Sequence, residues 1–216
     1  MVAAEPREFD GILKRAGEVR PLAWPGAAFS RETAYKKNRW LLVANGPGSK
    51  LVERALERKP TVDGILSIGF CGALDPALQI GDIVIAGEVP KALGAPYVQG
   101  DVASVDRVAV TAREKRELRA ATGAAVVEME SAAVAQRARE WSLPFGCVRV
   151  VSDAAEEDLP LDFNRYRDPD GRFEKTRIAL AGLVRPFTVL PALIRLDRQC
   201  RHASERLGEF FANCEN

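Results

Sequence analysis

Short, continuously apolar runs alternate along this chain with segments of helical character, and this alternation limits the possible folds more than any other feature. Continuous apolar runs are typical of strands that are buried on both faces of a sheet. Their alternation with helices favours an α/β fold: a single domain with a mostly parallel, twisted central sheet flanked by helices. The expected strands are residues 1–4, 40–44, 64–69, 82–86, 124–127 and 147–151, and the expected helices between them are 49–58, 112–122 and 130–141.

The C-terminal part of the chain has a different character. The stretch "DPDGRFEKTRIALAGLVRP" begins after a turn and continues into a helical pattern, and Pro186 and Pro191 precede a last amphipathic helix. We predict one domain over residues 1–184 and a C-terminal helical extension over residues 185–216 that packs on it. The extension mixes large apolar residues with arginines, so contact with a lipid interface is the alternative to packing.

Composition and cysteine usage exclude several classes of protein. The 31 basic and 30 acidic residues leave a net charge of +1, which does not favour nucleic-acid binding. The four cysteines are far apart without a CxxC pair, and the opening "MVAAEPREFD" does not resemble a signal peptide. No apolar run approaches the roughly 20 residues that span a bilayer. We therefore expect a cytoplasmic protein, with peripheral contact at the inner membrane as an alternative.

The single histidine restricts the chemistry. His202 lies in a basic, helix-like C-terminal stretch, where an exposed side chain is the ordinary case. Serine or cysteine catalysis with a histidine base, and histidine-rich metal sites, are therefore not expected. Acid and base chemistry would fall to carboxylates, and no metal or redox cofactor is implied.

Glycines and carboxylates follow the predicted strands. Ligands of open α/β sheets bind at the carboxyl ends of the strands, so these residues are expected to share one edge. The segment "NGPGSK" lacks the spacing of the phosphate loop and the third glycine of the dinucleotide fingerprint, which excludes both as interpretations. It could offer backbone N–H groups to an anion, or be an ordinary strand-to-helix turn.

Three motifs in order, "IGFCGALDPALQIGDIVIA", "VVEMESAAVAQRARE" and "CVRVVSDAAEED", resemble the superfamily of nucleoside phosphorylases and methylthioadenosine/S-adenosylhomocysteine nucleosidases. The resemblance covers roughly residues 1–165. The short length, the abbreviated segment 87–123 and the ending "RPFTVLPALIRLDRQCRHA" further resemble the hopanoid-associated phosphorylases, which remove adenine from adenosylhopane. The resemblance implies cleavage of a purine N-glycosidic bond in a 5′-modified adenosine by a homo-oligomer.

This reaction passes through an oxocarbenium-like sugar, so the site must protonate the leaving base and stabilise positive charge on the ribose. The resemblance implies that Asp153, beside Ser152, is the general acid at purine N7 and that Glu130 binds the ribose hydroxyls. Met129 would lie along the sugar face. Strand alternation turns Glu128 away from Glu130, which favours a structural role. The alternatives are a capping role for Ser152 or Asp153 and core packing for Met129.

Shorter motifs suggest the remaining nucleophile-binding groups. Glu8 aligns with the residue that orients the attacking water in the family, and an exposed acid in a first helical turn is the equal alternative. In a regular strand, Arg149 and Asp153 point to the same side. Arg149 would then pair with a carboxylate or with an anionic nucleophile.

Base recognition and reaction type depend on departures from the family pattern. Val108 and Ala109 stand in segment 104–110, where related nucleosidases have an aromatic residue, so Phe70 becomes the candidate for stacking the purine. Ser67 and Phe70 replace the arginine and serine that grip phosphate in hexameric phosphorylases. Water is therefore the expected nucleophile, and phosphorolysis, a methylthioadenosine/S-adenosylhomocysteine nucleosidase and a non-catalytic nucleoside-binding protein are the alternatives. The remaining candidate donors to an anion are the backbone amides of Gly46, Gly48 and Gly69.

Overall fold

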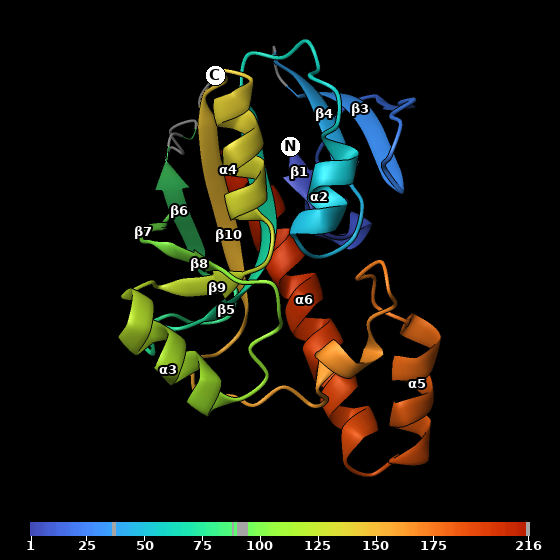
Figure 1. Ribbon diagram of the computed structural model, residues 1–216, viewed down its shortest axis with the longest axis vertical. Coiled ribbons are helices and arrows are strands. Elements are labelled where there is room, and N and C mark those ends of the chain that lie inside the picture. The colour runs from blue at the N-terminus through green and yellow to red at the C-terminus, as the bar shows by residue number, and fades with distance from the viewer. Residues whose placement is uncertain (36–37, 88, 90–94, 215–216) are drawn as a thin grey trace.

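The computed structural model describes residues 1–35, 38–87, 89 and 95–214. Part of the abbreviated segment 87–123 and the last two residues of the predicted extension therefore lie outside the described residues. The described chain forms one mixed sheet with helices on both faces (Figure 1).

The centre of the sheet is parallel. Four neighbouring strands in the order β4-β1-β5-β10 pair in parallel, and they include the two longest, β5 and β10. Strand β6 is antiparallel to β10, β3 is antiparallel to β4, and β9 is antiparallel to the end of β5. The strands are β1 (Val2–Ala3), β2 (Val19–Pro21), β3 (Phe29–Tyr35), β4 (Asn38–Ala44), β5 (Ile65–Ala73), β6 (Ile83–Gly87), β7 (Val98–Gln99), β8 (Val102–Ser104), β9 (Val126–Glu128) and β10 (Phe145–Asp153).

Successive residues of the central strands serve opposite faces. Val2 and Ile65 pack with helices α2 and α4 on one face, whereas Ala3 and Ile68 pack with α1 and α6 on the other. The helices are α1 (Asp10–Leu13), α2 (Ser49–Ala55), α3 (Ala112–Thr122), α4 (Ser131–Glu140), α5 (Lys175–Val184) and α6 (Val189–Ala212), with 3₁₀ turns η1 (Pro6–Phe9) and η2 (Phe163–Tyr166).

The last helix is part of the main core. Leu207, Phe210 and Phe211 of α6 are buried against the sheet, and α6 crosses α1 so closely that a side chain at Gly11 would overlap the backbone at Ser204. The first half of α6 extends beyond the sheet and packs with α5 as a protruding hairpin (Figure 1). Within the described ranges, no helix is both long and apolar enough to cross a membrane.

The expected α/β fold with a central sheet and flanking helices is confirmed, with two corrections to its details. Parallel pairing dominates only the centre, because β6 and β9 run antiparallel to β10 and β5, and β3 runs antiparallel to β4. In addition, β2, β3, β7 and β8 were not recognised from sequence. Strand β2 is fully exposed and β3 has the polar sequence "FSRETAY", so neither shows a continuous apolar run. Pro191 lies inside the first turn of α6 rather than before it, where a missing N–H costs no helical hydrogen bond.

Candidate functional site

Three carboxylates are buried at the carboxyl ends of neighbouring strands. Glu8 follows β1, Glu130 follows β9, and Asp153 ends β10; each is at most 7% exposed. The pKa of each is raised above its ordinary value, and burial is the largest cause in all three. Each of these buried carboxyl groups must therefore be protonated or lie beside a positively charged group.

Glu8 is held by the backbone on both of its oxygens. It lies in the 3₁₀ turn η1, where Oε2 accepts from the N–H of Glu5 at 2.7 Å, while Oε1 accepts from the N–H of Phe70 at 2.7 Å. The neighbouring Glu5 pairs instead with Arg7 and Lys175 nearer the surface. The alternative of an exposed acid at position 8 is inconsistent with this burial.

Arg149 lies fully buried beside Glu8. Its Nη2 forms an ion pair with Glu128 and donates to Ser67 Oγ at 2.6 Å, whereas no described residue accepts from Nε or Nη1. A Cβ at Gly69 would lie 2.3 Å from Glu8 Oε1 and 3.0 Å from Arg149 Nη1, and φ there is 143°. Only glycine fits at this position. The Glu8 carboxylate and the Arg149 guanidinium therefore both lie against the backbone of Gly69.

The two glutamates of "EMES" have different environments. Glu128 accepts from the N–H groups of Glu130 and Ser131, from Ser131 Oγ and from Arg149, so both of its oxygens hold the turn together. Burial would raise the pKa of Glu128, but Arg149 and Ser131 lower it overall. Glu130 accepts only backbone N–H groups, chiefly that of Gly48 at 2.8 Å, and burial with the neighbouring Glu128 charge raises its pKa to about 8.

Asp153 does not follow a regular strand, which corrects one expectation. The register of β10 against β5 shifts between Val151 and Asp153, so the alternation expected to place Asp153 on the side of Arg149 is broken. Ser152 Oγ lies within hydrogen-bond distance of Asp153 Oδ1 (2.9 Å) and of the Cys71 carbonyl (3.1 Å). It orients the carboxyl rather than capping a helix.

Lys115 was missed by the sequence reasoning. Its side chain is fully buried, and Nζ lies 2.6 Å from Asp153 Oδ2 while donating to the carbonyls of Ala154 (2.7 Å) and Glu157 (3.0 Å). The ion pair lowers the pKa of Asp153, but burial raises it further. The only feature of the sequence that indicates burial of Lys115 is its position three residues before Leu118, which puts both on one face of the helix. A lysine at such a position is ordinarily exposed.

The segment expected to recognise the base is braced by another residue. The amide of Asn164 accepts from Val108 N–H at 2.9 Å and donates to Val108 C=O at 3.0 Å, while Ala109 is buried in a small core cluster. The ring of Phe70 lies under the Arg7 guanidinium, 5.5 Å from Arg7 Cζ. It lines a cavity of about 310 Å³ between α1 and α6, and neither Val108 nor Ala109 lines that cavity.

The glycine turn after β4 is already hydrogen-bonded, which corrects a second expectation. The N–H of Gly46 donates to Ala4 C=O at 2.8 Å and that of Gly48 donates to Glu130, so neither is free for an anion. Close to Gly48 lie Met129 Cε and, from the irregular segment 162–174, Arg167; the methyl would be 3.9 Å from a Cβ at Gly48. Arg167 had no recognisable motif in the sequence.

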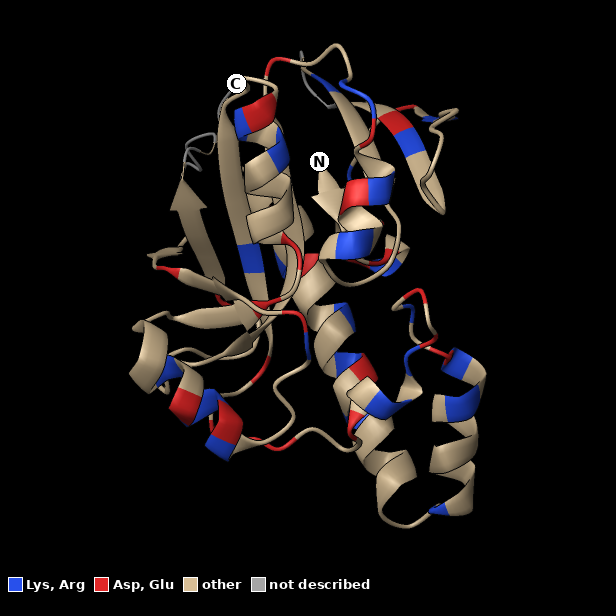
Figure 2. Cartoon of the chain, viewed as in Figure 1, with Lys and Arg blue, Asp and Glu red and all other residues tan. Residues whose placement is uncertain are grey.

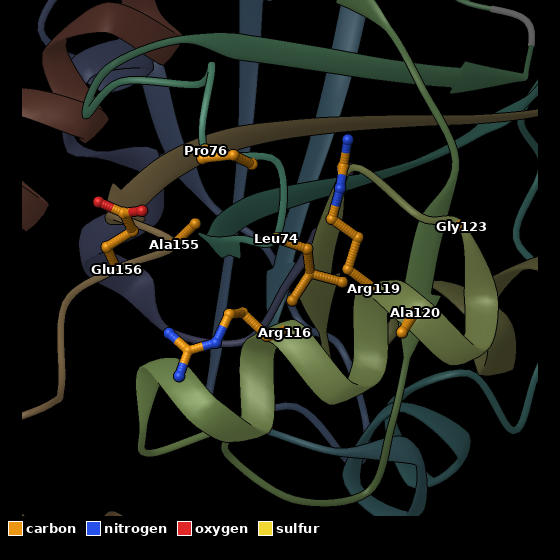
Figure 3. A pocket seen from close by; sticks show the side chains of 8 residues that line it. All are labelled: Leu74, Pro76, Arg116, Arg119, Ala120, Gly123, Ala155 and Glu156. Carbon is orange, nitrogen blue, oxygen red and sulfur yellow. The ribbon is translucent and has the colours of Figure 1, made fainter.

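A pocket in the described structure lies away from this carboxylate set. It encloses about 510 Å³ between α3 and the turns after β5 and β10, and none of the predicted site residues line it (Figure 3). Among the residues with described positions, no group of three or more histidine, cysteine, aspartate and glutamate side chains is arranged to hold a metal ion.

The mixed sheet flanked by helices defines a class of α/β fold that also occurs in solved nucleosidases. The nucleosidase of Neisseria meningitidis in complex with methylthio-immucillin-A superposes with a TM-score of 0.67 at 20% identity, covering 98% of this chain and 96% of that one. The futalosine hydrolase of Helicobacter pylori superposes with a TM-score of 0.66 at 17% identity, covering 98% and 94%.

Sequence comparison is consistent with this fold. Residues 86–187 match the phosphorylase superfamily. The chain is 29% identical over 150 residues to the 5′-methylthioadenosine/S-adenosylhomocysteine nucleosidase of Shewanella sp. (strain MR-7), which covers 51% of this chain and 64% of that relative. The chain is therefore similar to the phosphorylase superfamily over residues 86–187 and spans about two thirds of the length of this nucleosidase relative, a similarity in the direction that its three motifs indicated.

Proposed function

We propose that this protein is an N-ribosyl hydrolase that releases adenine from a 5′-modified adenosine, with adenosylhopane as its substrate. The observation that carries the proposal is the set of three buried carboxyl groups with raised pKa values: Glu8 and Glu130 lie near the buried Arg149, and Asp153 lies beside the buried Lys115. Breaking an N-glycosidic bond calls for such groups, since one must deliver a proton and another must face a cationic sugar.

Asp153 is the proposed general acid. Burial favours its protonated form, and Ser152 and Lys115 fix its two oxygens. The proton passes to purine N7 while the electron pair of the bond between C1′ and N9 passes to the base. Lys115 acts as a positioning residue, because it contacts the acid and not the substrate.

Glu130 is proposed to bind the ribose hydroxyls, with Met129 beside the sugar. The Gly48 N–H fixes one oxygen of Glu130, which leaves the carboxylate oriented before substrate binds. A carboxylate gains interaction energy as the ribose becomes cationic, so it stabilises the transition state more than the bound substrate.

Glu8 and Arg149 are proposed to orient the attacking water. Water can accept from Arg149 Nη1 and donate to Glu8, and after attack at C1′ its proton passes to Glu8. A phosphate dianion would instead be repelled by two carboxylates. The N–H groups of Gly46 and Gly48 could not bind it, because they already donate to Ala4 C=O and to Glu130. Phosphorolysis remains the second candidate because two buried nitrogens of Arg149, Nε and Nη1, have no acceptor among the described residues.

The lipid-linked substrate is supported by the resemblance of the C-terminal sequence to the hopanoid-associated phosphorylases. Methylthioadenosine and S-adenosylhomocysteine are the competing substrates, since the sequence relative bears their names. A cytoplasmic homo-oligomer that needs no cofactor remains a prediction, which sedimentation velocity and activity after chelation would test.

The test is adenine release from adenosylhopane, methylthioadenosine and S-adenosylhomocysteine, each with and without phosphate. Release from the lipid nucleoside that is independent of phosphate is the expected result. A ribose 1-phosphate product would establish phosphorolysis instead.

Asp153→Asn separates catalysis from binding. Turnover should fall by a factor of about 100 to 10,000, typical of a lost general acid, while substrate affinity stays near the wild-type value. If neither protein releases adenine from any substrate but both bind it, the chain is a nucleoside-binding protein.

A further inference from the structure

The α5–α6 hairpin carries an exposed apolar apex. One face of α5 packs on α6, where a Cβ at Gly182 would lie 3.0 Å from Leu193 Cδ1. The opposite face and the connecting turn are open: Leu183 is 65% exposed, Val184 71% and Phe187 92%. Large apolar side chains exposed together at this level are typical of a surface that contacts something else.

The charge at the tip of this apex is positive. Residues 175–196 contain Lys175, Arg177, Arg185 and Arg195 and no aspartate or glutamate, but Lys175, Arg177 and Arg195 pair with Glu5, Glu174 and Glu157 outside this range. Figure 2 shows basic positions along the ribbon of the hairpin and, at its far end, one basic position in the turn. Arg185 lies between Val184 and Phe187 in that turn, and it forms no ion pair with any described residue.

The shape of the apex favours a lipid surface over a second protein. A stable protein interface buries about 800 Å² on each partner, and the end of a two-helix hairpin is small and convex. A lipid headgroup layer accepts a convex apolar tip, and arginine beside it meets lipid phosphates. The apolar residues of α6 that could have formed an alternative membrane face, such as Leu207 and Phe210, are buried in the core.

We propose that the α5–α6 hairpin docks this protein on anionic membranes by inserting Val184, Phe187 and their neighbours into the headgroup layer. The proposal places lipid contact at the apex of the hairpin, whereas the alternative drawn from the sequence placed it on the C-terminal helical extension. The physical basis of the docking is independent of the site chemistry, and only its use, delivery of a lipid-linked nucleoside, rests on the proposed function.

The experiment is sedimentation of the full chain with vesicles of phosphatidylcholine mixed with phosphatidylglycerol, and with phosphatidylcholine alone. We expect binding to the anionic vesicles, weakened by salt. The variant V184S/F187S should lose roughly tenfold or more in vesicle affinity, since each apolar side chain no longer leaves water. Arg185→Gln should lose about fivefold on anionic vesicles only. The matched control is Val19→Ser, an exposed valine of β2 far from the hairpin, which should change nothing.

The outcomes separate docking from catalysis. Adenine release from a soluble nucleoside should be unchanged in all these variants, so loss of vesicle binding with normal turnover supports docking alone. Absence of vesicle binding by the wild-type chain, or equal binding by V184S/F187S, overturns the proposal. A shift from dimer to monomer caused by V184S/F187S in sedimentation velocity would also overturn it, because the apex would then be a protein interface.

Discussion

Replacing Lys115 by methionine should destabilise the protein in a way that depends on pH. All three protons of Nζ have acceptors, namely Asp153 Oδ2 and the carbonyls of Ala154 and Glu157. Methionine fills a similar volume and donates nothing. Removing one partner of a buried ion pair costs about 3–5 kcal/mol in free energy of unfolding. Protonation of Asp153 in the variant reduces part of that cost, so in mildly acidic solution we expect Lys115→Met to lower the free energy of unfolding by about 3 kcal/mol.

The sign of the pH effect follows from the pKa of Asp153. In the wild type it is already raised by burial, although Lys115 lowers it, so without Lys115 it must rise further. An acid with a raised folded-state pKa stabilises the fold fully below its unfolded pKa, about 3.9, and loses that contribution as pH rises to the folded pKa. Lys115→Met should therefore lose stability more steeply than the wild type between pH 4 and pH 8, by up to about 1.4 kcal/mol per pH unit.

Chemical unfolding at pH 5 and pH 8 measures this difference, and the pH profile of adenine release gives an independent readout. A proposed general acid with a higher pKa keeps its proton longer, so the alkaline limb of the rate profile should move to higher pH in Lys115→Met. The control is Arg116→Met on the exposed side of the same helix, which should stay within about 0.5 kcal/mol of the wild type. Equal unfolding curves for the two variants would refute the pairing argument.

Two further substitutions test other parts of the carboxylate set. Glu130→Gln should reduce turnover strongly. In the wild type, Glu130 has a folded-state pKa of about 8, so it lowers the free energy of unfolding as pH rises from about 4.3 to 8. Without this carboxyl group, the free energy of unfolding measured by chemical unfolding should depend less on pH over that range. A variant as pH-sensitive as the wild type would contradict this. Gly69→Ala should lower the free energy of unfolding by more than about 2 kcal/mol, because the new Cβ would overlap Glu8. The control is Gly123→Ala, which is also at positive φ but has open space around it. It should cost only about 1 kcal/mol of backbone strain, as measured by thermal or chemical unfolding. Equal losses would show that Glu8 moves aside easily.

The sequence places Glu130 and Asp153 shortly after continuous apolar runs, which are recognised without tertiary information, but only the resemblance to the family implied their roles. It could not locate Lys115, since a lysine on a polar helix looks solvated until the segment after β10 is seen to fold over it. The break between Val151 and Asp153 was equally hidden, because a register shift depends on the partner strand. Asn164 lies in the single 3₁₀ turn η2 and Arg167 in the irregular chain after it, so no periodic pattern could connect them with Val108 or Gly48.

The charge balance of the buried set links the fold to the proposed chemistry. Glu8, Glu128 and Glu130 surround a single cation, Arg149, whose closest ion pair is with Glu128. Glu130 is therefore left without a cation of its own, which is why burial and the Glu128 charge raise its pKa. A sugar that becomes cationic at C1′ supplies the missing positive charge only in the transition state. Under the proposed mechanism, the free energy that is lost in burying the surplus carboxylates would be recovered at the step that breaks the glycosidic bond, and not on binding of the neutral substrate.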